Sequence, residues 1–250
     1  MQDFVHLHVH TQYSVLDGQS SIPRLVDKAI KNGMRGMAVT DHGNMMGIKE
    51  FYNYVKKKKS GAKDELKKWE DKLALIESGQ YQPDPARKDQ KDDIGKSKEE
   101  LLALCRKNIE SARFVISFKP ILGCEMYVAH HKMTDRNGKE DQSGWHLIVL
   151  AKNEKGYHNL IKLVSRAWTD GFYQKPRTDH DELVKYREGL IVCSACLGGE
   201  IPQHILNGNI EAAEASVRWF KDTFGNDFYL ELQRHEVKDP EQRANRETFP

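Results

Sequence analysis

The sequence predicts an α/β fold, and a closed or nearly closed barrel is favoured over an open sheet. Segments of strand and helix character alternate along most of the 250 residues. At least six segments have strand character, and helical segments lie between most of them. This alternation is typical of parallel strands that are joined by helices. The length permits a full hydrophobic core, in one large domain or two small ones.

The first expected strand covers residues 4–10. Its apolar and polar residues alternate strictly, so that His6, His8 and His10 share one face and the apolar side chains share the other. This period of two predicts a half-buried strand. Because they lie two residues apart, the His8 and His10 imidazoles point to the same side.

Helix and strand signals follow in turn. Residues 20–33 indicate a helix that begins near a proline and closes at Gly33. Residues 36–42 are a short apolar strand with a polar end, and residues 47–58 have helical character. Strand, helix, strand and helix in this order indicate parallel strands.

Residues 56–113, called the arm here, interrupt the pattern. They hold 16 Lys and Arg and 12 Asp and Glu, a net charge of +4, whereas the remaining chain has a net charge of −2. Two apolar stripes of helical spacing flank a polar, proline-bearing stretch at residues 80–95, which predicts an inserted helical hairpin. A charged pair of helices with a solvated outer face explains the arm better than a dedicated DNA-binding or partner-binding arm.

The alternation resumes after the arm. Strands are expected at residues 120–128, 146–151, 190–195 and 227–233, and helices at residues 154–169 and 210–223. Asn137-Gly138 is a turn of the hairpin type. Residues 241–250 begin a helical pattern and stop without a cap, which indicates a fragment of a longer chain.

Composition excludes several classes of protein. A net charge of +2 does not mark a general nucleic-acid binder, although a local patch is compatible with it. No apolar run is long enough to span a membrane, and residues 1–4 lack the pattern of a signal peptide. The four cysteines do not form a disulfide framework. We therefore expect a cytoplasmic protein without a membrane partner.

Several expected strands end in side chains that bind metals. They supply imidazole, carboxylate and thiolate groups, which together suit zinc, whereas a site dominated by carboxylates would favour magnesium or manganese. In barrels of this class such groups meet at the carboxyl ends of the strands. The candidates are His8, His10, Asp41, His42, Glu125, His146 and Cys196.

Other residues of these types have simpler explanations. His6 is best explained as an ordinary polar strand residue. Cys193 and Cys196 form a lone Cys-X-X-Cys pair beside an apolar strand, which argues against a redox or zinc-knuckle pair. His130 and His131 follow a strand near Glu125, and a surface loop accounts for them equally well.

Six blocks occur in order along the chain. They are His-Leu-His-Val-His-Thr-Gln-Tyr-Ser-Val-Leu-Asp-Gly (6–18), Thr-Asp-His-Gly-Asn-Met (40–45), Lys-Pro-Ile-Leu-Gly-Cys-Glu-Met-Tyr-Val (119–128), His-Leu-Ile-Val-Leu-Ala (146–151), Gly-Phe-Tyr-Gln-Lys-Pro-Arg (171–177) and Ser-Ala-Cys-Leu-Gly-Gly-Glu-Ile (194–201). Together they resemble the amino-terminal PHP domain (polymerase and histidinol phosphatase) of bacterial DNA polymerase III alpha subunits. The resemblance runs from about residue 4 to residue 236, without the arm, and would make residues 1–250 one PHP domain.

The resemblance implies a distorted seven-stranded (β/α) barrel, similar to a TIM barrel, with up to three ions of zinc or manganese. His8 and His10 would share one ion with Glu125, and Glu125 would bridge to a second ion on His146 and Cys196. Asp17 and His42 would hold the third. The Asp-X-His pair that completes the family's site does not occur before Pro250, so we expect the first and third ions to be weakly held.

The resemblance also implies a function. The parent chain would be a DNA-directed DNA polymerase of replication, with its magnesium-dependent polymerising carboxylates in later domains. The partners would be DNA and other replicase subunits. The PHP domain itself would hydrolyse DNA from 3′ to 5′ with its metal cluster. Two alternatives stay open: an inert scaffold that docks a separate proofreading exonuclease, and a free-standing phosphoesterase of the histidinol phosphatase type.

Overall fold

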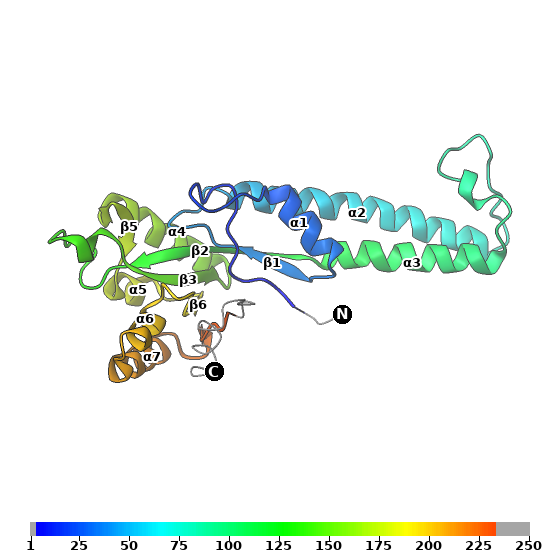
Figure 1. The fold of residues 1–250 in the computed structure, drawn as a ribbon. Coiled ribbons are helices and arrows are strands. Elements are labelled where there is room, and N and C mark those ends of the chain that lie inside the picture. The colour runs from blue at the N-terminus through cyan, green and yellow to red at the C-terminus, as the bar shows by residue number, and fades with distance from the viewer. Residues whose placement is uncertain (1–3, 234–250) are drawn as a thin grey trace, which may run out of the picture. The chain divides into compact units, whose positions relative to one another are not determined.

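The computed structural model describes residues 4–233, which form α/β structure (Figure 1). The chain divides into two compact units whose boundary lies between Cys124 and Glu125. Each unit has its own buried apolar residues, such as Phe51 and Phe118 in the first and Leu160 and Phe220 in the second.

Within residues 4–124, the first unit contains three α-helices, one 3-10 helix and a short parallel strand pair. Its elements are α1 (Ile22–Lys31), β1 (Gly36–Val39), α2 (Ile48–Glu77), the short 3-10 helix η1 (Lys91–Asp93), α3 (Lys98–Ser117) and the beginning of β2 (Lys119–Val128). As the sequence predicts, proline occupies the first turn of α1, and Gly33 follows the helix with a φ of 77°. β1 pairs in parallel with β2, from Gly36 opposite Lys119 to Val39 opposite Leu122.

The strand predicted for residues 4–10 is not a regular strand. The segment lies beside β1, where His6 and Val9 accept backbone hydrogen bonds from Ala38 and Thr40 at 2.8 and 2.9 Å. However, the Val9 amide donates to the Thr40 hydroxyl rather than to a backbone carbonyl, which interrupts the ladder. Leu7 is also exposed, so the predicted apolar face is not fully buried.

α2 and α3 lie side by side as a long antiparallel pair (Figure 1). α2 is a single helix of 30 residues, so the prediction that it ends near residue 58 is wrong. The helix continues because no proline interrupts it and because apolar residues recur on the face toward α3. Ile76, Leu101 and Cys105 form a buried cluster between the two helices. A capping box between Ser97 and Glu100 begins α3.

The second unit contains the rest of the sheet and its helices. Its elements are the end of β2, η2 (Lys139–Gln142), β3 (Trp145–Ala151), α4 (Glu154–Thr169), β4 (Phe172–Tyr173), β5 (Lys175–Thr178), α5 (His180–Tyr186), β6 (Leu190–Cys193), α6 (Glu200–Leu206), α7 (Ile210–Phe224), η3 (Gly225–Asp227) and β7 (Phe228–Tyr229). The predicted bounds of the helix at 154–169 are confirmed.

The strand order is β4-β5-β2-β3-β6-β7, with β1 also on β2, and the sheet is not closed within residues 4–233. The expectation of uniformly parallel strands is wrong. β2 and β5 are parallel, as are β6 and β7, but β3 and β6 are antiparallel. The antiparallel hairpin of β4 and β5 lies in the connection between β3 and β6, so this connection is not a simple helical crossover.

The last predicted strand is much shorter than expected. Only Phe228 and Tyr229 of residues 227–233 are strand, because Leu230 and Leu232 are exposed and have no buried face to occupy. The helix expected from residue 241 lies outside the described residues. All four cysteines are free. In the part of the chain that the structure describes, no helix is long and apolar enough to cross a membrane.

Candidate metal centre

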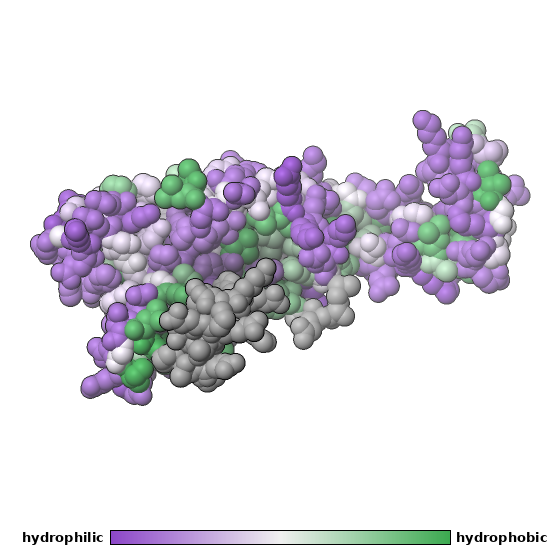
Figure 2. All heavy atoms as spheres, viewed as in Figure 1, coloured by the Kyte–Doolittle hydropathy of each residue, from purple (hydrophilic) through white to green (hydrophobic). Residues whose placement is uncertain are grey.

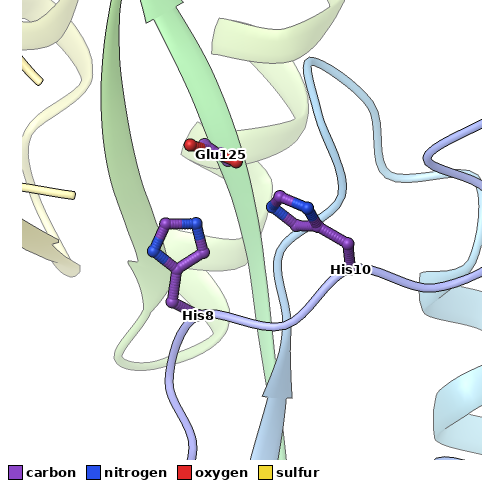
Figure 3. Close-up of side chains that lie close together, drawn as sticks. All are labelled: His8, His10 and Glu125. Carbon is purple, nitrogen blue, oxygen red and sulfur yellow. The ribbon is translucent and has the colours of Figure 1, made fainter. Parts of the chain in front are cut away.

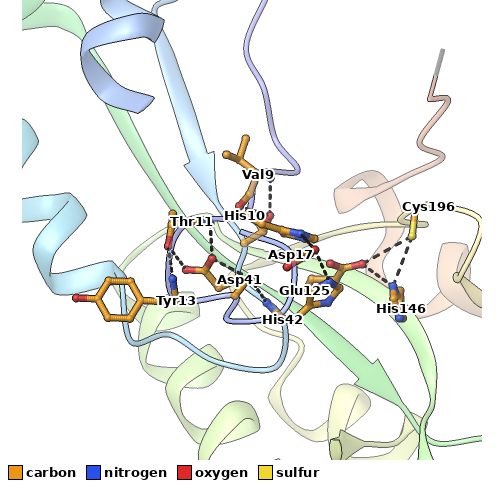
Figure 4. A network of polar contacts seen from close by, with 12 residues as sticks. Val9, His10, Thr11, Tyr13, Asp17, Asp41, His42, Glu125, His146 and Cys196 are labelled. Carbon is orange, nitrogen blue, oxygen red and sulfur yellow. Dashed lines mark hydrogen bonds and ion pairs between the residues drawn. The ribbon is translucent and has the colours of Figure 1, made fainter. Parts of the chain in front are cut away.

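Three predicted ligands meet in the first unit. Oδ2 of Asp17 lies 2.7 Å from Nδ1 of His10 and 3.1 Å from Nε2 of His42 (Figure 4). The rings of His10 and His42 are 4.2 Å apart between centroids. One nitrogen from each histidine and one carboxylate oxygen are therefore close enough to hold a single metal ion. Burial disfavours the charged form of Asp17, but the two histidines outweigh it and lower the pKa of this carboxyl.

His8 and His10 project from the same side of their segment, as the two-residue spacing predicts (Figure 3). Their rings are 5.3 Å apart between centroids. His6 is more exposed than either and lies edge-on against Phe4. The structure is thus compatible with the prediction that His8 and His10 are candidate ligands and that His6 is an ordinary polar residue.

Asp41 holds the loop that carries Asp17, a role that the sequence analysis missed. Its carboxylate is 1% exposed and accepts hydrogen bonds from the Thr11 amide, the Thr11 hydroxyl and the Ser14 hydroxyl at 2.6, 2.9 and 3.0 Å. The Ser14 hydroxyl in turn accepts from the His42 amide at 3.0 Å. A buried carboxylate requires such hydrogen-bond donors. The position of Asp41 at the end of an apolar strand was therefore the sequence signal for this supporting role.

A second group of predicted ligands meets in the second unit. Oε1 of Glu125 lies 2.7 Å from Nδ1 of His146 and 3.8 Å from the sulfur of Cys196 (Figure 4). The Cys196 sulfur is 3.5 Å from the same histidine nitrogen. Glu125 comes from β2, His146 is the second residue of β3, and Cys196 follows β6. The Glu125 side chain is fully buried, so its charge depends on these neighbours.

The contacts in this group shift two pKa values. Burial opposes a charged His146, but hydrogen bonds with Cys196 and Glu125 outweigh it and raise the pKa of His146 to about 9. The hydrogen bond from His146 also lowers the pKa of the Cys196 thiol despite its burial. In contrast, burial raises the pKa of Cys193 to about 12, so this thiol stays protonated. Cys196 therefore has the chemical character of a ligand, and Cys193 does not.

Two glycines let the Cys196 loop approach His146. The Gly198 carbonyl accepts from the His146 amide at 2.8 Å, and Gly199 forms a parallel bridge with the same residue. A Cβ at Gly198 would lie 3.0 Å from the His146 ring, and one at Gly199 would lie 2.2 Å from the Ser194 carbonyl oxygen. Gly198 and Gly199 are thus required because a side chain at either position would collide with its surroundings.

The donor sets of both groups fit transition metals. The first group offers two imidazoles and one carboxylate, and the second offers imidazole, carboxylate and a thiol whose deprotonation is favoured. Zinc accepts all of these donors, and a thiolate disfavours magnesium. That His8 and His10 share an ion with Glu125, and that Glu125 bridges two ions, remain predictions.

Comparison with known proteins agrees with the resemblance. The chain is 40% identical to DNA polymerase III subunit alpha of Borreliella burgdorferi over 239 residues, which are 94% of this chain and 16% of that protein. It is 34% identical to the protein of the same name from Aquifex aeolicus over 252 residues, with 98% and 16% covered. The chain thus spans about one sixth of the length of these relatives. The model of the PHP domain family matches residues 6–235, so the chain belongs to the PHP domain family.

Proposed function

We propose that this chain is the PHP portion of a DNA polymerase III alpha subunit. The relatives that carry this name support the proposal, since they match nearly the whole chain. The longer chain would extend DNA primers with carboxylates and magnesium outside these residues, in contact with DNA and other replicase subunits. The complete domain would close into the seven-stranded barrel that the family resemblance implies.

For the PHP domain itself, the proposed function is metal-dependent hydrolysis of DNA from the 3′ end. The group of Glu125, His146 and Cys196 is the observation that carries this proposal. It joins a fully buried carboxylate, a half-buried imidazole and an activated thiol within 3.8 Å. Groups with shifted pKa values that converge in this way are typical of functional sites.

His146, Glu125 and Cys196 would hold one ion, and His10, Asp17 and His42 another. Zinc or manganese ions held there would supply a water nucleophile at neutral pH and charge stabilisation for a phosphodiester. Asp41 keeps the loop of residues 11–17 in place and so orients Asp17. The buried Glu125 carboxylate orients the His146 ring through its 2.7 Å contact.

The proposal is tested by elemental analysis together with a nuclease assay. The purified chain should hold zinc-like ions, and a chelator should remove them. Release of mononucleotides from a 3′-labelled primer, with zinc or manganese added, measures the hydrolysis. Because the Asp-X-His pair is not among these 250 residues, we expect metal binding but little activity from this chain, and activity from a chain extended through the next strand.

A matched pair of histidine variants separates the site from general effects. His146→Ala should lose its ion and the nuclease activity of the extended chain. His158→Ala should retain both, because His158 is exposed on α4, where it lies beside Tyr157 and 4.0 Å from Glu154. An extended chain that holds its full complement of ions and releases no nucleotide would support the scaffold that docks a proofreading exonuclease.

A further inference from the structure

A hollow of about 320 Å³ lies where α2 enters the arm. Lys56, Lys59 and Lys63 line it, together with Tyr52 and Pro120. The lysines and the tyrosine are spaced by three or four residues, so they follow one face of α2. All of these residues belong to the first unit, and none of them is a predicted metal ligand.

Some cations of the first unit are neutralised by carboxylates. Lys58 pairs with Asp27 at 3.0 Å, and Arg113 pairs with Glu70 at 2.8 Å. Within residues 4–233, no carboxylate lies within ion-pair distance of Lys56, Lys59 or Lys63. The structure therefore gathers positive charge on one face of α2 without neutralising it.

Lys59 shows that the clustered positive charges repel one another. Burial and the neighbouring charges of Lys63 and Lys119 lower the pKa of Lys59. Like charges on one helix face destabilise the helix, so an anion that bound among them would remove a repulsion as well as add contacts. The site thus favours a ligand with more than one negative charge.

The rest of the hollow offers an exposed aromatic side chain on which a planar ring can stack. Tyr52 is 50% exposed at the end of the lysine stripe, and Val55 is almost fully buried beneath it. Hydrophilic side chains cover much of the visible face of α2 and α3 (Figure 2). A basic stripe beside an exposed aromatic ring is the combination by which proteins bind single-stranded nucleic acids, through phosphates and stacked bases.

We propose that this stripe of Lys56, Lys59 and Lys63 binds the phosphate backbone of single-stranded DNA, with a base stacked on Tyr52. The sequence favours a solvated face for the arm, because its charges of both signs are mixed along the chain. In the structure the three lysines lie together at one hollow, whereas Glu70 and Asp93 pair with Arg113 and Lys72. This binding does not depend on the metal groups.

The test measures binding of a fluorescent oligothymidine of about 16 nucleotides by anisotropy, with a chelator present. Lys56, Lys59 and Lys63 are changed together to Glu in one variant. In a control variant Lys67, Lys88 and Lys107 are changed to Glu, since these exposed arm lysines give the same change in charge. The stripe variant should bind at least about tenfold more weakly than the control, and its salt slope should fall by about 2.

Two further variants distinguish specific contacts from a change in folding. Arg at the three stripe positions should retain binding, and Tyr52→Ala should weaken it about tenfold while Tyr52→Phe does not. Thermal unfolding checks each variant, and the three lysines changed to Gln replace a Glu variant that does not fold. Equal losses in the stripe and control variants, or no loss in either, would overturn the proposal. Because a chelator is present, this result is separate from the outcome for the nuclease.

Discussion

The two groups of metal-type ligands are built on different supports. In the first, His10, Asp17 and His42 lie outside regular elements, and the Asp17 side chain is 44% exposed. In the second, Glu125 and His146 lie on strands β2 and β3, and Glu125 is fully buried. The first group thus depends on side chains that fix a loop, whereas the sheet itself positions most of the second.

The two groups also differ in which side chains have shifted pKa values. Two histidines lower the pKa of Asp17 in the first group. In the second, the histidine is the group whose pKa rises, and a thiol is activated beside it. Metal must therefore displace a proton from the second group, which makes its affinity more sensitive to pH.

Removal of Glu125 should have the largest effect. Glu125→Ala should lower metal affinity in the second unit by about 100-fold or more, since it removes a buried ligand and leaves His146 without its carboxylate. Titration with cobalt checks this result, because a cobalt thiolate absorption reports binding at Cys196. Glu214→Ala is the matched surface control, and His6→Ala should also have little effect. Equal losses for Glu125→Ala and His6→Ala would contradict the assigned ligands.

A change of pH should affect the second group next most strongly. Because the pKa of His146 is about 9, its affinity for metal should fall about tenfold per unit of pH below 9. Without metal, the free energy of unfolding has the opposite dependence on pH. The contacts of charged His146 stabilise the fold below pH 6.5, and this contribution is lost as the pH rises through about 9. Calorimetry in two buffers checks the proton release, and a flat pH dependence would contradict this assignment.

Loss of the Asp41 charge should weaken the first group selectively. Asp41→Asn removes an acceptor for Thr11 and Ser14, so we expect about tenfold weaker binding at Asp17. The cobalt thiolate absorption of the second group should persist. Asp64→Asn on the exposed face of α2 is a control of the same chemistry. A variant that lost both groups would show that Asp41 supports the whole fold.

The smallest effect is expected from a single methyl group. Gly198→Ala places a Cβ about 3.0 Å from the His146 ring, so it should lower metal affinity in the second group a few-fold, by about 1 kcal/mol. Gly61→Ala is the control, because a Cβ there meets nothing within 4 Å. This control should stabilise α2 by about 1 kcal/mol. Thermal unfolding and metal titration separate the two effects.

Much of this organisation follows from local sequence patterns. The helix at residues 154–169, the proline in the first turn of α1 and two of the strands that carry ligands were predictable. These features depend on hydrophobic period and end signals, which act over a few residues. The candidate ligands could also be named from the sequence, because imidazole, carboxylate and thiol groups occur at or near several predicted strands, and their role as ligands stays a prediction.

Tertiary structure decided what depends on distant residues. Residues 4–10 have the alternation of a strand, yet the hydroxyl of Thr40 takes the place of a ladder acceptor. The antiparallel pairing of β3 with β6 and the support of Asp17 by Asp41 have no local signal. Each depends on which partners the fold brings within hydrogen-bond or ion-pair distance, and a local pattern does not contain that information.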